Sequence, residues 1–487
     1  MEKSEKPPKE PGKLRQFLAA LIVNQLGMSY GIVMGWPSPS ALQLQSSSSP
    51  VGDEPMTDAG VSWLTGILTL SGTIVTVLLS VIPDRFSRKS FGYALTLPIL
   101  IAWLLIAFAT NHTYIYVSRA LSGVSGAGTF FLVSNYVSEI SCDSIRGMLA
   151  AILVLSVNTG VLISYILGGI MSFHTFPVVV IALAIFFFVT FIFLPESPAY
   201  LVRQNRMHEA IRALKWLKGG NDLVAAERAL SHVQLQVKEI ASMKTAKFTD
   251  LFRDKATTKA LIIALGLFIF QQTSGHFGML SNTETIFKMS GSSLSPNASA
   301  IIVAVLLLFG SWVATVVVDR LGRRPLFLLS TAGMCVCHCV IATFCSLQNL
   351  QYDVSAYSSI PVVALSIFMV IFSLGMGSGP VVILCEIFAR DVTPLASAVT
   401  LSVSWAAAFV VTKSFTDLIA LLGMHGCFFL FAAFCACNFM FCYALLPETK
   451  GRNREDIVDE LNGVRCTKNS NNVKHTIGSD SAHAAYV

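Results

Sequence analysis

Long apolar runs, repeated along almost the whole chain, are the feature that most restricts its fold. Twelve of them reach ~17 to 25 residues, the length that a helix needs to cross the hydrocarbon core of a bilayer. Their approximate limits are 17–35, 61–82, 91–110, 114–138, 149–169, 177–194, 259–280, 299–318, 326–346, 360–385, 395–418 and 425–446. Only 13% of the 487 residues are charged, whereas 54% are apolar, which leaves too few charges to cover a water-soluble protein. The sequence therefore predicts an all-α polytopic membrane protein with twelve transmembrane helices.

Three short polar motifs occur once in each half of the chain, at the same place relative to the apolar runs. The pairs are Asp84-Arg85 with Asp319-Arg320, Glu139 with Glu386, and Pro195-Glu196 with Pro447-Glu448. Echoes at one long interval indicate a duplicated bundle of spans. We therefore expect two pseudo-symmetric six-helix halves joined by linker helices on the cytoplasmic side. The expected divisions are a disordered N-terminus at 1–16, the first bundle at 17–194, the linker at 195–258, the second bundle at 259–446, and a C-terminal segment with a disordered tail at 447–487.

The positive charges predict the orientation in the membrane. All but three of the 34 Lys and Arg residues fall on the side that carries both termini and the charged turns; the exceptions are Arg119, Lys288 and Lys413. That side is cytoplasmic by the positive-inside rule. The net charge of +6 then reflects topology and attraction to anionic lipid, and no nucleic-acid partner is expected. The first apolar run shows no cleavage site and continues into a span, so we expect a multi-pass protein of the cell membrane with both termini cytoplasmic.

Charged residues at the cytoplasmic ends of the runs predict ion pairs between neighbouring helices. A carboxylate at a helix end beside guanidinium groups can hold helices in one conformation. An orientation signal alone would need positive charge but no Asp, so the repeat of Asp84 as Asp319 favours such a latch. Arg146 is the expected partner of Glu139, and Arg390 lies one turn from Glu386.

The seventh run contains an unusually polar segment from Gln271 to Gly278. Two amides, two hydroxyls and two glycines in a membrane span indicate a broken helix that faces a hydrated cavity. Amides both donate and accept hydrogen bonds, which suits a neutral polyhydroxyl ligand better than an ion. The alternative is that Gln271 and Gln272 hold helices together through interhelical hydrogen bonds. Adjacent residues point about 100° apart, so one glutamine can face a cavity and the other a neighbouring helix.

Two further features concern modification and metals. Asn297-Ala298-Ser299 is an acceptor sequence for N-glycosylation in a loop predicted to be external. Cys335, Cys337 and Cys339 alternate within one run, a spacing that fits neither a zinc site nor a disulfide on a helix. We therefore expect a glycan at Asn297, and neither a metal nor a cofactor.

Taken together, five motifs in order resemble those of the sugar porters of the major facilitator superfamily. They are Asp-Arg-x-Gly-Arg-Arg at 319–324 (altered at 84–89), Tyr136-x-x-Glu139 followed by Arg146-Gly147, Pro-Glu-Ser-Pro at 195–198, Gln-Gln-x-Ser-Gly at 271–275, and Pro-Glu-Thr-Lys-Gly at 447–451. The resemblance covers about residues 17–463. Within the family, the segments 35–39, 57–63 and 411–415 look like those of the arthropod facilitated trehalose transporters. The resemblance implies twelve helices in two halves, with a sugar site between them.

The resemblance also implies roles for single residues. Gln271 and Gln272 would contact the sugar and Trp405 would form a wall of its cavity. Phe277 and Ser404 stand where the family usually has Asn. Residues 378–381 stand where the family usually has Pro-x-Pro-Trp. The implied cytoplasmic gating network is Asp84, Arg85, Arg88, Glu139, Arg146, Glu196, Asp319, Arg320, Arg323, Glu386, Arg390 and Glu448.

These observations favour a facilitative carrier for a neutral sugar, such as trehalose or a hexose, that works by alternating access. A proton-coupled symporter is a second hypothesis; it needs a carboxylate that faces the cavity, and the first run has none between Phe17 and Gly35. A sugar receptor or sensor that does not transport is a third, because several site positions are altered. An enzyme is not expected, since no nucleophile, phosphate-binding loop or metal cluster is evident.

Overall fold

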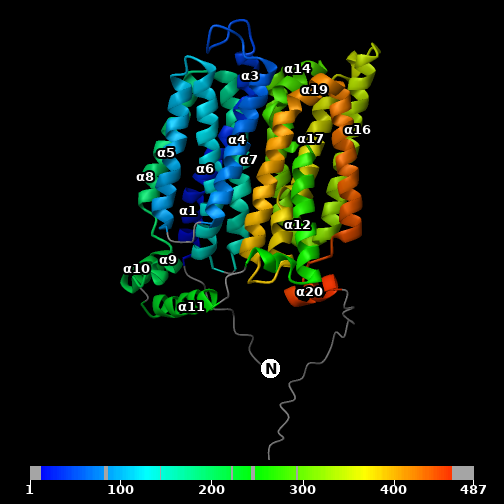
Figure 1. Ribbon diagram of the computed structural model, residues 1–487. Helices are drawn as coiled ribbons and strands as arrows, with labels where there is room; N and C mark the ends of the chain where they lie inside the picture. Colours follow the sequence, from blue (N-terminus) through cyan, green and yellow to red (C-terminus); the bar gives the residue numbers. More distant parts are fainter. Residues whose placement is uncertain are drawn as a thin grey trace, which may run out of the picture.

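The computed structural model describes residues 12–81, 86–142, 144–220, 223–242, 247–291 and 294–462. All regular elements within these ranges are helices (Figure 1). The first half of the chain forms α1 (Lys13–Val23), α2 (Gln25–Gly35), α3 (Pro37–Leu44), α4 (Asp58–Val81), α5 (Arg88–Ala107), α6 (His112–Ile140), α7 (Arg146–Ile170) and α8 (Thr175–Ile192). The linker forms α9 (Pro198–Arg203), α10 (Met207–Lys218) and α11 (Leu223–Ser242).

The second half begins after a short 3-10 turn, η1 (Phe248–Phe252). Its helices are α12 (Lys255–Thr273), α13 (His276–Ser281), α14 (Thr283–Ser290), α15 (Pro296–Leu321), α16 (Arg323–Asn349), α17 (Ile360–Phe372), α18 (Gly379–Ile387), α19 (Thr393–Leu445) and α20 (Arg454–Asn462). A 3-10 turn, η2 (Ser355–Tyr357), precedes α17, and a π-helical turn, η3 (Ser373–Gly377), separates α17 from α18.

The number of spans agrees approximately with the twelve predicted. Ten stretches of the described chain are long and apolar enough to cross a membrane. One of them, α19, has 53 residues and contains two helices, because Gly423 breaks it with non-helical backbone angles. The more polar α6 is not among the ten, but its 29 residues are also long enough to span.

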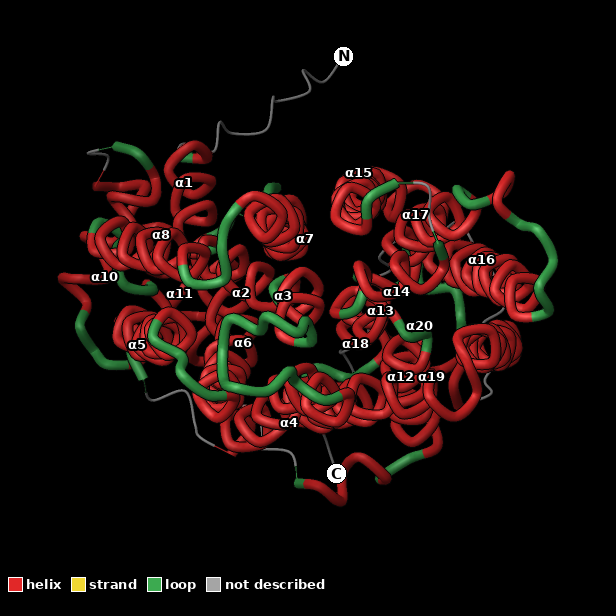
Figure 2. The backbone as a smooth tube through the Cα atoms, turned by 90° about the horizontal axis from the view of Figure 1, so that it is seen from above, coloured by secondary structure: helices red, strands yellow, loops and turns green. Residues whose placement is uncertain are grey.

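The helices form two groups that meet along two seams. Figure 2 shows α1–α8 in one group and α12–α19 in the other. The first seam is made by α4 against α19, and the second by α7 against α15. Small residues bring helices close within each group; a Cβ on Gly31 of α2 would lie 1.9 Å from the carbonyl oxygen of Val157 of α7. Gly27 and Gly35 also face α7, so three glycines of α2 let these two helices approach closely.

The two ends of the helices carry different elements. We call the end with α9, α10, α11 and α20 the linker face, and the end with α3 and α14 the loop face (Figure 1). At the linker face, α9–α11 bury a small apolar cluster of their own around Leu201 and Ala210. The linker helices therefore pack as a unit beside the first group of helices.

Candidate transport site and gates

The polar segment of the seventh run is a broken helix, as predicted. The break lies between α12 and α13, where Gly275 has a φ of 80°, a conformation that favours glycine. The carbonyl oxygen of Ser274, freed by the break, lies 3.0 Å from Nε2 of His338 on α16. The break is therefore held by a side chain of a neighbouring helix.

Both glutamines donate hydrogen bonds inside the second half. Nε2 of Gln271 donates to the carbonyl oxygens of Met376 (2.5 Å) and Gly377 (3.0 Å) in η3. Nε2 of Gln272 donates to Oγ of Ser404 on α19 at 3.0 Å. These are the interhelical bonds of the alternative interpretation. The amide oxygens remain as acceptors. Among the described residues, that of Gln271 has a long contact, 3.4 Å, with Nε2 of Gln272.

Trp405 reaches from the second half to the first. Its ring lies edge-on to Tyr30 and Phe130, with centroid distances of 6.2 and 6.5 Å. A Cβ on Gly72 of α4 would be 2.7 Å from the indole, so glycine leaves room for the ring there. Ser404 thus places a hydroxyl next to Gln272, and Trp405, the next residue of α19, reaches the first half. Phe277 lies on α13 beside His276.

In the first half, a charged cluster fixes the linker-face end of α5. The carboxylate of Glu196 accepts the backbone N–H groups of Arg88 (3.0 Å), Lys89 (3.2 Å) and Ser197 (2.9 Å). The guanidinium of Arg88 pairs with Glu139 of α6 at 3.0 Å. Arg203 of α9 pairs with the same carboxylate at 2.9 Å.

The second half repeats this arrangement at the start of α16. Glu448 accepts the backbone N–H groups of Arg323 (3.0 Å), Arg324 (3.1 Å) and Lys450 (2.8 Å). Burial alone would raise the pKa of Glu448, but the backbone N–H groups together hold this pKa below its ordinary value. The guanidinium of Arg323 pairs with Glu386 at 3.1 Å. The repeat seen in the sequence is therefore a repeated structural unit.

Several members of the predicted network make contacts that the sequence did not indicate. Arg146 donates to the carbonyl oxygen of Ser141 at 3.4 Å, and Arg390 pairs with Glu239 of α11 at 3.3 Å rather than with Glu386. The backbone of Arg320 accepts Nζ of Lys450 at 2.6 Å. Asp84, Arg85 and the side chain of Asp319 lie outside the described residues. Sequence reasoning missed Arg203 and also Thr449, whose hydroxyl donates to Glu386.

At the loop face, neutral groups join α3 and α7 of the first half to the second half. The hydroxyl of Tyr165 on α7 donates to the carbonyl oxygen of Leu280 at 2.5 Å and lies 3.0 Å from Oγ1 of Thr283. Asn297 Nδ2 donates back to the carbonyl oxygen of Tyr165 at 2.9 Å. The backbone N–H of Glu284 donates to Oγ of Ser38 on α3 at 3.1 Å. We call Ser38, Tyr165, Leu280, Thr283, Glu284 and Asn297 the loop-face gate.

The packing of Asn297 argues against the predicted glycan. Its amide nitrogen donates to both Tyr165 and Glu284, and a Cβ on Gly169 would lie only 2.1 Å from its Oδ1. A glycan is attached through this same nitrogen and would have to fit between α7 and α15. The acceptor sequence predicted that Asn297 carries a glycan, but it did not indicate that the side chain lies within the gate.

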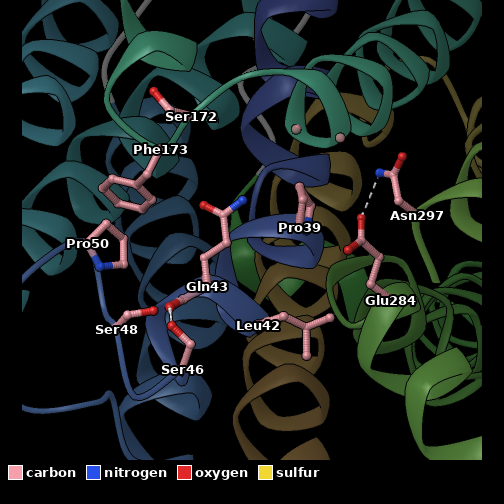
Figure 3. Close-up of a pocket in the computed structure, with 12 residues that line it drawn as sticks. Pro39, Leu42, Gln43, Ser46, Ser48, Pro50, Ser172, Phe173, Glu284 and Asn297 are labelled. Carbon is pink, nitrogen blue, oxygen red and sulfur yellow. Dashed lines mark hydrogen bonds between the residues drawn. The ribbon is translucent and has the colours of Figure 1, made fainter. Parts of the chain in front are cut away.

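A cavity of about 500 Å³ lies beside the gate at the loop face (Figure 3). Glu284 and Asn297 line it from the second half, and Pro39, Gln43 and Ser172 from the first. Figure 3 shows the Glu284 carboxylate directed toward the amide of Asn297. The cavity and the gate together thus define a partly polar vestibule.

Comparisons with known proteins agree with this architecture. The sequence model of a family described as "Sugar (and other) transporter" matches residues 16–461. A structure of the proton:xylose symporter XylE bound to 6-bromo-6-deoxy-D-glucose superimposes with a TM-score of 0.71 at 19% identity, covering 92% of this chain and 99% of that one. An inward-open structure of XylE from E. coli superimposes with a TM-score of 0.74 at 19% identity, covering 91% of this chain and 99% of that one. The fold is therefore that of a major facilitator superfamily transporter.

Sequence relatives are consistent with the family match. The facilitated trehalose transporter Tret1 of Anopheles gambiae is 32% identical over 461 residues, which are 94% of this chain and 58% of that protein. Tret1 of Culex quinquefasciatus is 32% identical over 460 residues, 94% of this chain and 88% of that protein. This chain belongs to the sugar transporter family.

Proposed function

We propose that this protein is a facilitative carrier that moves a neutral sugar, trehalose or a hexose, across the cell membrane by alternating access. The hydrogen-bonded pair of Gln272 and Ser404 in the second half, with Trp405 at the seam between the halves, carries the proposal. It offers an amide, a hydroxyl and an aromatic face without a charge, which suits sugar hydroxyls and the apolar face of a sugar ring. The names of the relatives support the choice of sugar.

In the proposed site, the amide oxygens of Gln271 and Gln272 accept sugar hydroxyl groups. Their nitrogens already bind η3 and α19, so these bonds orient the oxygens. Trp405 forms the wall toward the first half. Phe277 and Ser404 offer fewer hydrogen bonds than the Asn that the family usually has, so they restrict which sugar is accepted.

Transport proceeds by tilting of the two halves about this site. The halves are residues 17–194 and 259–446, and the linker face is cytoplasmic. The ion pairs of the linker face keep the ends of α5 and α16 rigid, while the neutral loop-face gate opens and closes. The first run offers no carboxylate for proton coupling between Phe17 and Gly35, which supports uniport.

Flux into liposomes tests the proposal. Purified protein should equilibrate radiolabelled trehalose or a hexose down its gradient, and an imposed pH gradient alone should drive no accumulation. Gln272→Ala should raise the KM for sugar about tenfold, because a neutral hydrogen bond contributes ~0.5–1.5 kcal/mol. Gln236→Ala, which changes an exposed glutamine of α11, is the control.

Two outcomes would contradict the proposal. Tight sugar binding without flux would indicate a receptor, and accumulation driven by the pH gradient would indicate a symporter. Phe277→Asn, which restores the amide usual in the family, should broaden the range of sugars carried. An unchanged range would remove Phe277 from the site.

A further inference from the structure

Glu284 is a buried carboxylate within the loop-face gate. It lies on α14, and only 6% of its surface is exposed. Its backbone N–H is bound to Ser38 of the first half, and its Oε1 accepts Nδ2 of Asn297 at 3.0 Å. Asn297 in turn donates to Tyr165 of the first half. The carboxylate is therefore bound into the contacts that close the gate.

The surroundings of Glu284 differ from those of the half-buried carboxylates at the linker face. Glu139 faces two guanidinium groups, and Glu196 and Glu448 each accept three backbone N–H groups from described residues. The described side-chain contact of Glu284 is one neutral amide. An ionised carboxylate in such a place is costly, because no counter-charge among the described residues compensates for its burial.

Few charged or titratable groups face Glu284. Helices α3, α13, α15 and α17 pack around α14. Helices α3 and α17 contain no charged or titratable residue. Helix α13 contains His276 at the end away from α14, and α15 contains no charged or titratable residue before Asp319. Tyr165 of α7 is the neutral phenol of the gate, and Lys288, one turn along α14, is exposed. Burial raises the pKa of Glu284 above its ordinary value, and the hydrogen bond from Asn297 offsets only part of this effect.

The loop-face cavity leads to this carboxylate. Glu284 and Asn297 form one wall of the space of about 500 Å³ described above (Figure 3). A proton from the loop-face side can therefore reach Glu284 while the gate is closed. When the gate opens, Glu284 is exposed to the same side.

We propose that Glu284 is a proton-binding site through which acidification on the loop-face side holds the gate closed. The proposal rests on the proposed alternating-access function and on the loop face being external. Because the proton enters and leaves on one side, no proton is carried across the membrane. The site therefore adds external pH sensing to a facilitative carrier without making it a symporter.

The sign follows from linkage between proton binding and closure. In the open gate, Glu284 is hydrated and keeps its ordinary pKa, whereas in the closed gate burial raises this pKa. Closing of the gate thus takes up a proton when the pH lies between the ordinary and the raised pKa of Glu284. Each fall of one pH unit within this window shifts the closed-to-open ratio by up to about tenfold toward closed. Above the window the ratio no longer changes.

The distance across the gate measures closure without any need for sugar flux. Genetically encoded spin-labelled residues at Ser172 and Met289 report on opposite sides of the loop face and leave the native cysteines in place. In lipid nanodiscs, the share of the shorter distance should rise as pH falls. Glu284→Gln, which keeps an acceptor for Asn297 but has no charge, should show the short distance at every pH. Glu54→Gln, which changes an exposed loop carboxylate on the same face, should behave as the unmodified protein.

A second variant keeps the proposal testable if Glu284→Gln does not fold. Asn297→Asp places another carboxylate beside Glu284 and should favour the open gate at neutral pH, with a larger response to acid. A Glu284→Gln protein that keeps the original pH response overturns the proposal. In liposomes with separately buffered sides, a response to acid on the linker-face side alone also overturns it. A pH-dependent distance in a protein without sugar flux would refute the carrier function and leave the proton site intact.

Discussion

The charged clusters of the linker face and the loop-face gate are held by opposite kinds of interaction. At the linker face, charged groups join helices of the same half, as in the pairs Arg88–Glu139 and Arg323–Glu386. At the loop face, neutral hydrogen bonds from Tyr165 and Asn297 join one half to the other. Breaking a buried ion pair costs ~3–5 kcal/mol, whereas a neutral hydrogen bond contributes only ~0.5–1.5 kcal/mol. The strong contacts thus lie within the halves, and the weak ones lie at the gate, where the halves separate in the proposed transport cycle.

The two charged clusters also differ from each other. The side chains of Arg88 and Glu139 are 5% and 13% exposed, whereas those of Arg323 and Glu386 are 15% and 28% exposed. Solvent weakens an ion pair, so the cluster of the first half should contribute more to stability. The linker adds to this difference, because Arg203 of α9 also binds Glu139.

The largest expected effect comes from removing the shared carboxylate of the first half. Glu139→Gln takes away the charge that both Arg88 and Arg203 bind, and should lower the free energy of unfolding by about 3 kcal/mol. Thermal unfolding in detergent, followed by tryptophan fluorescence, measures the change. Glu386→Gln is the matched variant and should cost roughly half as much. Equal losses would show that the two clusters are equivalent despite their different exposure.

A methyl group at the loop-face seam should open the gate without weakening either half. Gly169→Ala would place a Cβ 2.1 Å from Oδ1 of Asn297, which has to move and lose its bonds to Tyr165 and Glu284. Overpacking of this kind costs about 1–3 kcal/mol. The distance between labels at Ser172 and Met289 should lengthen. Gly147→Ala is the control on the same helix, since no atom lies within 4 Å of its added Cβ.

Removing one neutral bond of the gate should have a smaller effect in the same direction. Tyr165→Phe deletes the hydroxyl that binds Leu280 and Thr283, and should shift the open-to-closed ratio by about 1 kcal/mol, roughly fivefold. The label distance should lengthen, while the unfolding temperature changes little. Tyr352→Phe, at an exposed tyrosine, is the control. A fall in unfolding temperature without a change in distance would assign Tyr165 to the packing of α7 alone.

Features that repeat or have a regular period could be predicted from the sequence. The apolar runs, the duplicated halves, the break near Gly275 and the paired positions of Glu196 and Glu448 are all present in the structure. Each depends on a local pattern or on its repetition. Helix length, a helix break and a helix-end carboxylate are therefore visible without knowledge of distant contacts.

The partners of charged and polar side chains could not be predicted in this way. Arg203 reaches Glu139 because α9 folds back beneath the first half, and no repeat marks this residue. Asn297 carries an acceptor sequence, yet its amide is used within the gate. A lone carboxylate such as Glu284 has no motif at all, and its burial becomes evident only when α14 is packed against α3 and α15.

The smallest expected effect concerns a charged contact that should not matter for stability. Arg390 pairs with Glu239 of α11 at 3.3 Å, but both side chains are exposed. Exposed pairs contribute ~0–1 kcal/mol, so Glu239→Gln should leave the unfolding temperature almost unchanged. Because this pair ties the linker to the second half, its loss should instead show as faster hydrogen exchange in α11. A large loss of stability would mean that exposed charged pairs also hold the linker to the second half. The contrast between charged contacts within the halves and neutral contacts at the loop-face gate would then be wrong.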